Sequence, residues 1–408
     1  MRAVVYEDRS PKTFGPLTAL RAQFELRCGA VSLLDKLRLR RPAWDVAVVP
    51  RRELADVVSE RLGVSEPPGD DGTTLFLCGR VVVDDRLLEA VEGLDGEALL
   101  TSGGTVVGAL VERGAAHVAE RVRETGEPGR EGLDRTVEVP ARVVGYPWEL
   151  VRLTAEEIGR DAPLVARLGE TAGTIVDGAR VVGRANVSVG KGSVIAAGAV
   201  LDATDGPIVI GDGATVMSNA VIYGPASVGE RSVVKAGARI CGGSSLGEVC
   251  KVGGEVSACV FQGWANKQHE GFLGNSYVGS WVNIGAATDN SDLKNTYEPV
   301  RVRIDGKLVD TGQTFVGATI GDHSKTAIGT KLNTGTVVGI FCNVLCYGFP
   351  PKELRAFSWG TGRSFAVQDV DRAISTARLV MARRGVELSL AEETLIRRVF
   401  ERARGGKK

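Results

Sequence analysis

Apolar residues recur at every sixth position through the middle and second half of the chain. Nine consecutive positions spaced by six are Ile210, Val216, Ile222, Val228, Val234, Ile240, Leu246, Val252 and Ala258. The same register extends upstream to Val176 and downstream to Val344, so about 170 residues share one period. Neither the period of two of a strand nor the 3.6 of an α-helix produces this spacing.

Glycine often follows the repeated position, as in Val182-Gly183, Val228-Gly229 and Leu246-Gly247. Glycine makes up 53 of the 408 residues, nearly twice its roughly 7% average usage. It permits tight corners that need positive φ. The pattern predicts short strands joined by corners and stacked roughly 4.8 Å apart, with three hexads in each coil of a parallel β-helix.

The period is interrupted twice, and the first interruption lies between Ala258 and Val278. The spacing there is two residues beyond a multiple of six, and the segment includes His269, one of only three histidines. We expect an extruded loop near 261–277. Loops projecting from a rigid scaffold commonly carry function, so this segment is a candidate site.

The second interruption covers residues 288–313. Val300, Val302 and Ile304 alternate with polar residues before Asp305-Gly306. Alternation followed by Asp-Gly predicts an extruded β-hairpin with a two-residue turn.

The regions that flank the repeat have ordinary periodicities. Strands are expected at 2–6, 45–49, 74–83 and 105–111, with helices at 51–63 and 84–94 and a loop at 121–132, which indicates an α/β sheet. The expected organisation is a reduced α/β domain over 1–140, a helical connector over 141–172, the β-helix over 173–348 and a C-terminal helical segment over 349–408.

Two amphipathic helices are predicted in the C-terminal segment. One has Val370, Ile374, Ala377 and Met381 on a single face and stops at Gly385. Ser389 and Glu392 form a capping box before the second, whose apolar residues are Leu395, Ile396, Val399 and Phe400. We expect these helices to cover the end of the β-helix or a neighbouring subunit.

Charge and composition exclude several classes of partner. Lys plus Arg and Asp plus Glu number 50 each, so no overall charge attracts nucleic acid or an anionic membrane. No apolar run approaches the roughly 20 residues that span a bilayer, and the first residues lack the apolar stretch of a signal peptide. A cytoplasmic protein is expected, with its seven scattered cysteines reduced.

The residues around the first interruption follow a specific order. His269 is followed after three residues by Phe272, then by Leu273-Gly274, and after fourteen by Asn283 of an Asn-Ile-Gly-Ala-Ala-Thr segment. This order resembles the acetyltransferase half of the bacterial bifunctional glucosamine-1-phosphate N-acetyltransferase and N-acetylglucosamine-1-phosphate uridylyltransferase family, in a branch with a shortened front domain. The resemblance implies a left-handed β-helix, acetyl-CoA as cosubstrate, and a homotrimer with sites between neighbouring subunits.

The resemblance also implies roles for individual residues. His269 is the expected general base, and Asn283 and Phe272 are expected to contact the substrate. Acetyl-CoA is expected to meet Ala286, Ala318 and Thr336, mostly through backbone.

The sequence departs from the family at the phosphate subsite. Two basic residues that bind the sugar phosphate in the family align approximately with Cys241 and Cys259, and Phe272 stands where the family commonly has Tyr. Other cations would therefore have to hold the phosphate, and the candidates are Lys267, Lys294, Arg239 and Lys251.

Acetyl transfer to an amine requires a proton acceptor, and neutral imidazole with its ordinary pKa near 6.5 is suitable. Alternatives stay open: His269 as a hydrogen-bonding loop residue, Asn283 as a member of a structural side-chain ladder, and His323 as a corner residue bonded to backbone. No covalent intermediate is required, so no cysteine needs to act as nucleophile.

The front domain resembles a sugar nucleotidyltransferase at 14–29 and 75–91. The glycine-rich loop that wraps the triphosphate in that family is missing. Arg21, Arg80 and Asp84, with the neighbouring Asp85, are candidates for binding nucleotide phosphate or Mg²⁺, and the alternative is that they are solvated caps at strand ends. Mg²⁺ is expected only if this domain transfers nucleotides.

Three functions remain. The first is acetylation of a hexosamine phosphate, of the glucosamine-1-phosphate type, in the synthesis of UDP-N-acetylglucosamine and cell-envelope sugars. The second is uridylyl or thymidylyl transfer, with the β-helix as scaffold, which NTP and Mg²⁺ dependence would reveal. The third is sugar-nucleotide binding without turnover. A γ-type carbonic anhydrase needs three zinc-binding histidines, and the β-helix has only His269 and His323, so this class is excluded.

Overall fold

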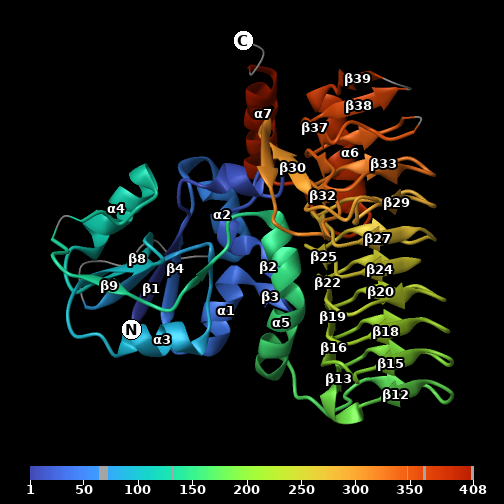
Figure 1. Ribbon diagram of the computed structural model, residues 1–408, viewed down its shortest axis with the longest axis horizontal. Helices are drawn as coiled ribbons and strands as arrows, with labels where there is room; N and C mark the ends of the chain where they lie inside the picture. The colour runs from blue at the N-terminus through green and yellow to red at the C-terminus, as the bar shows by residue number, and fades with distance from the viewer. Residues whose placement is uncertain (64–71, 131, 347, 362–363, 406–408) are drawn as a thin grey trace. The chain divides into compact units, whose positions relative to one another are not determined.

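The computed structural model describes residues 1–63, 72–130, 132–346, 348–361 and 364–405 (Figure 1). The chain forms two compact units, which are described separately. Unit 1 comprises 1–14, 20–26 and 31–146, and unit 2 comprises 15–19, 27–30 and 147–408. The main division thus falls at 146/147, against the expected 140. Glu131 of the loop expected at 121–132, and 362–363 and 406–408 of the C-terminal segment, lie outside the described residues.

Unit 1 is an α/β domain built on a six-stranded sheet. The strand order is β4 (Asp45–Val49), β1 (Arg2–Tyr6), β5 (Thr74–Cys78), β8 (Thr105–Val111), β7 (Ala98–Ser102) and β9 (Thr136–Glu138). β1 pairs in parallel with β4 and β5, whereas β8 runs antiparallel to β5 and β7. The expected strands are confirmed, with the third ending at Cys78.

The remaining elements of unit 1 surround this sheet. They are η1 (Pro11–Phe14), η2 (Gln23–Glu25), β3 (Val31–Ser32), α1 (Leu33–Arg40), η3 (Arg52–Leu54), α2 (Ala55–Leu62), β6 (Val81–Val82), α3 (Asp85–Glu92), α4 (Ala115–Thr125) and β10 (Arg142–Val143). The loop expected at 121–132 is wrong in its first five residues. These residues end α4, because Ala115, Val118 and Val122 bury one helical face.

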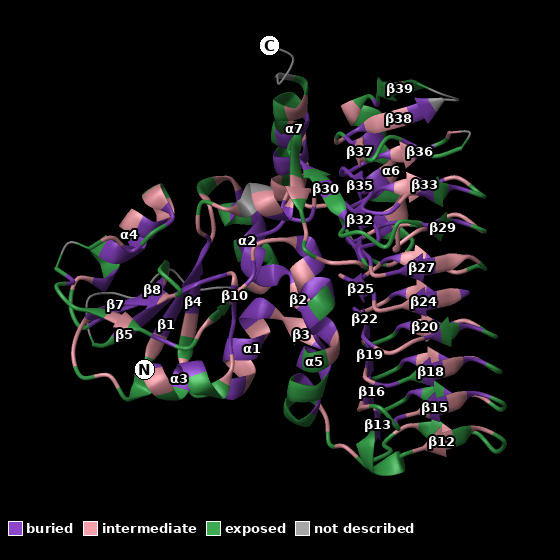
Figure 2. Cartoon of the chain, viewed as in Figure 1, coloured by how far each residue is buried: buried purple, intermediate pink, exposed green. Residues whose placement is uncertain are grey.

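Unit 2 contains the predicted parallel β-helix, with three sheets as its sides. Sheet 1 contains β13 (Val187–Val189), β16 (Ile208–Ile210), β19 (Ala226–Val228), β22 (Ser244–Leu246), β25 (Val260–Phe261), β28 (Tyr277–Val278), β32 (Thr319–Ile320), β35 (Val337–Val338) and β37 (Glu353–Leu354). Its strands are buried on both faces because α5 (Pro147–Val165) packs against β19, β22 and β28 (Figure 2). The expected helical connector is therefore present as α5.

Sheet 2 follows sheet 1 along each coil. Its strands are β11 (Thr174–Ile175), β14 (Val194–Ile195), β17 (Thr215–Val216), β20 (Val233–Val234), β23 (Lys251–Val252) and β26 (Asn266–Lys267). Asn283 bridges β26 to a further group consisting of β33 (Lys325–Thr326), β36 (Asn343–Val344), β38 (Ser358–Thr361) and β39 (Ser364–Val367).

Sheet 3 completes each coil. Its strands are β12 (Arg180–Val182), β15 (Val200–Asp202), β18 (Val221–Tyr223), β21 (Arg239–Ile240), β24 (Glu255–Ser257) and β27 (Phe272–Gly274). Farther along the chain β29 (Asp289–Asn290) pairs with β34 (Lys331–Leu332) on this side. The short helix η4 (Arg184–Asn186) lies between β12 and β13, and β2 (Arg27–Cys28) also belongs to unit 2.

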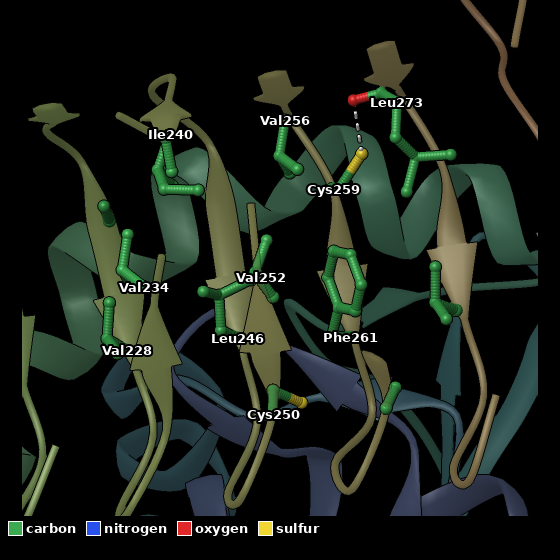
Figure 3. Packing of buried hydrophobic residues seen from close by; sticks show 14 of the residues in the cluster. Val228, Val234, Ile240, Leu246, Cys250, Val252, Val256, Cys259, Phe261 and Leu273 are labelled. Carbon is green, nitrogen blue, oxygen red and sulfur yellow. Dashed lines mark hydrogen bonds between the residues drawn. The ribbon is translucent and has the colours of Figure 1, made fainter. Parts of the chain in front are cut away.

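The core of the β-helix is a column of inward-pointing residues on each side. Val234, Ile240 and Leu246 are fully buried and stack with their counterparts in neighbouring coils (Figure 3). Burying each such side chain contributes roughly 1.5–3 kcal/mol. The hexad pattern is therefore confirmed as the core of the fold.

The predicted register fails at Ala258. This residue has φ of 49° at a corner, and Val256 takes the inward position on sheet 3 instead. The coil is shorter than its neighbours, because 15 residues separate Leu246 from its partner Phe261, against 18 between Val228 and Leu246. The extruded loop expected at 261–277 is wrong, because this segment forms the strands β25 to β28 of the β-helix.

The second interruption is the predicted hairpin. β30 (Arg301–Ile304) and β31 (Lys307–Asp310) pair antiparallel, with Ile304 opposite Lys307. Asp305 and Gly306 both have positive φ, as a type I′ turn requires. The excursion leaves between β29 and β32, at the edge where sheet 3 meets sheet 1.

The β-helix extends beyond the expected boundary at 348, because β37 to β39 continue to Val367. The helices α6 (Val370–Ala382) and α7 (Leu390–Gly405) follow, with Gly385 at φ of 71° between them. Their predicted apolar faces are buried except for Val370, which is partly exposed, and Ser389 Oγ accepts from the Glu392 N–H at 3.0 Å. No helix in the described part of the chain is long and apolar enough to cross a membrane.

Candidate functional site

His269 lies on the corner between β26 of sheet 2 and β27 of sheet 3. Its side chain is exposed, and within the described residues it makes no hydrogen bond. Both ring nitrogens are therefore open to a ligand. The corner itself is tightly built, because the backbone of Gly271 has φ of 123°, which L side chains rarely adopt.

Lys267 points into the β-helix and is 1% exposed. Its Nζ donates to the carbonyl oxygens of Gly253 at 3.0 Å, His269 at 3.1 Å and Gly271 at 2.7 Å. Burial lowers the pKa of this ammonium group. The expected substrate contact at Lys267 is wrong, because all three N–H donors are used inside the core. The side chain instead holds the corner that carries His269.

Asn283 lies on sheet 2, with its side chain exposed and without a hydrogen bond in the described part of the chain. The amide is thus not part of a structural ladder. Ala286, three residues later, lies one coil from His269, since the Ala287 N–H donates to Glu270 O at 2.8 Å. The Cα atoms of Asn283 and His269 are therefore roughly 10 Å apart, a span that one sugar ring with its substituents can bridge.

Phe272 lies on the sheet 3 side of the same corner. It is half-buried, and its N–H donates to Asp289 Oδ1 at 2.7 Å. Its register partner is Glu255, which in turn forms an ion pair with Arg239. The Arg239 guanidinium therefore already has a carboxylate partner. Asp289 was not among the expected residues. It lies 17 positions from Phe272 along the chain, and no sequence motif links the two residues.

Lys294 lies in the excursion, away from the His269 corner along the coil. Its Nζ donates to Pro299 O at 2.6 Å and lies 4.0 Å from Glu298. The excursion leaves at the edge between sheets 3 and 1, whereas His269 lies between sheets 2 and 3. The two interruptions of the repeat therefore lie at different edges of the β-helix.

The residues expected to contact acetyl-CoA divide between two edges. Ala286 shares the His269 corner, whereas Ala318 and Thr336 lie where sheet 3 meets sheet 1. Ala318 and Thr336 occupy adjacent coils, as their separation predicts, because Thr319 pairs with Val337. The two residues are 1% and 0% exposed with their backbone included, so in a single copy neither presents surface to a ligand. A single copy does not bring the three residues together.

The cysteines are free and most are buried. Burial raises the pKa of Cys78, Cys250, Cys259 and Cys342 to about 12, so these thiols are neutral at pH 7. Cys259, one of the two positions aligned with the family's phosphate-binding residues, donates to Leu273 O at 3.3 Å (Figure 3). These four side chains are poor nucleophiles, which agrees with direct transfer.

His323 belongs to an aromatic column at the edge between sheets 1 and 2. The ring stacks on Phe341 with centroids 4.6 Å apart, and Trp281 lies on its other side at 6.2 Å. It is 5% exposed, and φ is positive at each of these three corner residues. The histidine is thus packed into a corner of the β-helix.

The candidates in unit 1 have internal partners. Arg80 pairs with Asp8 at 2.5 Å and donates to Val144 O at 2.8 Å. Asp84 caps α3 by accepting from the Leu87 N–H at 3.0 Å. Asp84 is thus a helix cap.

Asp85 and Arg21 have internal partners as well. Asp85 pairs with Arg41 at 3.3 Å, and Arg21 is 7% exposed and makes contacts of its own. None of the unit 1 candidates is an unpaired charge facing solvent.

Two ion pairs follow the parallel strands of unit 1, at the edge where ligands bind in many open α/β sheets. Asp8 after β1 meets Arg80 after β5, and Glu7 meets Arg51 after β4 at 2.6 Å. Burial raises the pKa of Glu7 to about 6, against the lowering effect of Arg51. Among the described residues, no three His, Cys, Asp or Glu side chains are grouped closely enough to hold a metal ion.

Comparison with known proteins assigns the two parts of the chain separately. The family of sugar nucleotidyl transferases matches residues 3–168, and the bacterial transferase hexapeptide, as six repeats, matches residues 207–242. The chain joins a sugar nucleotidyltransferase-like domain to a hexapeptide-repeat β-helix. The expected fold class is thereby confirmed.

Two curated relatives match shorter stretches. The chain is 29% identical over 90 residues to a bifunctional sugar-1-phosphate nucleotidylyltransferase/acetyltransferase of Sulfurisphaera tokodaii, covering 22% of each chain. It is 35% identical over 82 residues to the bifunctional protein GlmU of Methanococcus vannielii, covering 19% of this chain and 20% of the relative. The matches thus span about a fifth of the length of either relative.

Solved structures of UDP-N-acetylglucosamine acyltransferases are distant. The Campylobacter jejuni enzyme is 12% identical, with a TM-score of 0.30, covering 56% of this chain and 83% of its own. The Francisella novicida enzyme is also 12% identical, with a TM-score of 0.22, covering 57% and 88%.

Proposed function

We propose that the protein is an acetyl-CoA-dependent N-acetyltransferase that acts on a hexosamine phosphate of the glucosamine-1-phosphate type. The observation that carries this proposal is the His269 corner. It presents an exposed imidazole without internal partners, held from inside by Lys267 and flanked by Asn283 and Phe272 on the two adjoining sheets. The names of the two curated relatives, which include acetyltransferase activity for one of them, support it.

The proposed reaction is a direct transfer. The amine nitrogen of the sugar attacks the thioester carbonyl, a C–N bond forms, and His269 accepts the proton that the amine loses. The C–S bond then breaks, and the thiolate of coenzyme A takes a proton, for which the imidazolium is the donor. The Asn283 amide or coil N–H groups stabilise the oxyanion.

The two edges on which the candidate residues lie favour a homotrimer. The edge of the β-helix that carries Ala318 and Thr336 is proposed to contact acetyl-CoA on one subunit, and His269 to act from its neighbour. This arrangement would bring Ala286, Ala318 and Thr336 to one ligand, which a single copy does not do. We assign the protein to the cytoplasm and to the synthesis of UDP-N-acetylglucosamine.

The test is release of free thiol from acetyl-CoA with glucosamine 1-phosphate, followed by other amino sugars. His269→Ala is expected to lower kcat by about 10²- to 10⁴-fold, the usual contribution of a general base. His117→Ala is the matched control, because His117 is an exposed histidine of α4 in unit 1. Absence of thiol release with every amino sugar would contradict the proposal.

A second candidate is nucleotidyl transfer by unit 1, favoured by the family match over residues 3–168. It predicts release of pyrophosphate from UTP or dTTP with a sugar 1-phosphate, dependent on Mg²⁺, with Arg80 as the residue to replace. Binding of a sugar nucleotide without turnover in either assay would identify the third function.

A further inference from the structure

Four cations were candidates for holding a phosphate, and the structure leaves one of them open. Lys267 is inside the core, Arg239 has a carboxylate partner, and Lys294 lies 4.0 Å from the Glu298 carboxylate in the excursion. Lys251 differs from these three. It lies on the outer face of sheet 2, is partly exposed, and within the described residues forms no ion pair.

The segment after α6 adds a second cation beside Lys251. Arg384 donates through Nη2 to Asn266 Oδ1 at 2.9 Å and through Nη1 to Val249 O at 3.3 Å. Asn266 is the register partner of Lys251, so the guanidinium lies over this part of sheet 2. Both partners of Arg384 are neutral, so its charge is not compensated by them.

Further cations surround the same strands. Arg384 is the largest cause that lowers the pKa of Lys251, followed by burial and by the charges of Lys235 and Arg383. Lys325 approaches from the other direction, as the register partner of Asn283, with its Nζ 3.1 Å from His323 O. The Asn283 cation cluster consists of Lys235, Lys251, Lys325, Arg383 and Arg384.

Asn283 lies within this cluster, one coil from Lys325 and two coils from Lys251. Its exposed side chain lies between Asn266, which holds Arg384, and Lys325, and adjacent coils are roughly 4.8 Å apart. Glu248, three residues before Lys251, is paired with Arg27 at 3.5 Å. None of these five cations has a carboxylate partner in the described chain. The cations repel one another, and a bound anion offsets the free energy of that repulsion.

We infer that the Asn283 cation cluster binds the phosphate group of a phosphate ester, with the Asn283 amide as an additional donor. Guanidinium and ammonium groups match phosphate oxygens with charge-assisted hydrogen bonds. The inference deepens the proposed transferase function by naming its phosphate subsite. Both substrates of that reaction, the sugar phosphate and coenzyme A, carry such an ester, so the chemistry of the cluster is shared between them.

The test is calorimetric titration of the full chain with two pairs of ligands. Glucosamine 1-phosphate is compared with glucosamine, and coenzyme A with pantetheine, so that each pair differs by its phosphates. The variant K251Q/R384Q removes two charges. A second variant, K251Q/R383Q, leaves both hydrogen bonds of Arg384 in place. The control R180Q/K191Q removes two exposed cations from early coils.

Both cluster variants are expected to weaken binding of one phosphate-bearing ligand at least tenfold and to leave its phosphate-free counterpart unchanged. The pair that responds identifies whether the sugar or the coenzyme supplies the phosphate. Equal affinities in the native protein and both cluster variants, or no binding of either phosphate ester by the native protein, would overturn the inference.

These outcomes are independent of the proposed chemistry. If the native protein releases thiol but the cluster variants bind the phosphate esters as tightly as the native protein, the subsite is wrong and the acetyltransferase proposal stands. If the cluster variants lose phosphate-dependent binding but the native protein releases no thiol, the subsite is supported and the acetyltransferase proposal is wrong.

Discussion

The coils from β13 to β24 and those from β26 to β34 share one fold but have different cores. In the first region the inward column of sheet 2 is aliphatic, as at Val216, Val234 and Val252. In the second region the corresponding positions include Lys267 and Thr326, and sheet 3 has Asn290. The polar core coincides with the coils that carry His269 and Asn283.

The polar side chains in the second region replace backbone bonds that the coils do not make. Asn290 accepts from the Gly274 N–H at 2.7 Å and donates to the Gly274 carbonyl at 3.0 Å, where β27 and β29 are not paired as strands. Thr326 Oγ1 accepts from the Gly285 N–H at 2.9 Å. Regular coils thus provide a rigid scaffold, and departures from regularity become possible where buried side chains satisfy the backbone.

The largest expected effect comes from Lys267→Met, which nearly keeps the length of the side chain but leaves the carbonyls of Gly253 and His269 without their donor, whereas Gly271 O still accepts from the Glu255 N–H at 3.1 Å. We expect the unfolding free energy to fall by roughly 3 kcal/mol, since each unsatisfied buried group costs about 1–3 kcal/mol. Thiol release should also fall through kcat, because the His269 corner loses its support. Chemical denaturation and steady-state kinetics measure the two effects.

Ile240→Ala is the control from the aliphatic region. It should cost a similar roughly 2–5 kcal/mol and leave kcat unchanged at temperatures where the protein is folded. If both variants lower kcat equally, the distinction between scaffold and site coils is wrong.

A smaller effect is expected from Asn290→Ala. The variant leaves the Gly274 N–H unpaired, while the Gly274 carbonyl still accepts from Ser276 Oγ at 2.7 Å. The unfolding free energy should therefore fall by about 2 kcal/mol in denaturant titrations. Asn295→Ala, at an exposed position of the excursion, should change it by less than about 0.5 kcal/mol. Equal stabilities of the two variants would show that Asn290 does not replace the missing strand pairing.

The buried Glu7 of unit 1 sharpens the comparison, because Glu7 forms an ion pair with Arg51, whereas Lys267 forms none with the residues that the structure describes. The pKa of Glu7 is raised from 4.5 to about 6, so the folded state binds the proton more tightly than the unfolded state. Stability therefore falls as pH rises from 4.5 through 6, by about 2 kcal/mol at roughly 1.4 kcal/mol per pKa unit.

Glu7→Gln should remove this contribution, as measured by denaturant titrations at pH 4.5 and pH 7. Glu60→Gln, at an exposed position of α2, should retain it. An unchanged pH dependence in Glu7→Gln would mean that the carboxyl group titrates normally.

The sequence predicted the regular parts of the fold well and the site coils less well. The hexads, the hairpin around Asp305-Gly306 and both C-terminal helices were confirmed, because each depends on residues close together along the chain. The register at Ala258 and the loop at 261–277 were wrong, because a 15-residue coil and an inward Lys267 do not follow the hexad pattern. His269 and Asn283 remain predictions as functional residues, although the structure exposes both.

The sequence by itself determined the β-helix, the α/β domain before it and the candidate histidine, since repeats, alternation and motif spacing are local properties. Only the tertiary structure decided which cations are available. Lys267 turned inward because carbonyls of two coils converge on it, Arg239 met a carboxylate one coil away, and Arg384 reached Asn266 across 118 positions of the chain. Such contacts depend on how coils stack and where helices fold back, which spacing along the chain does not specify.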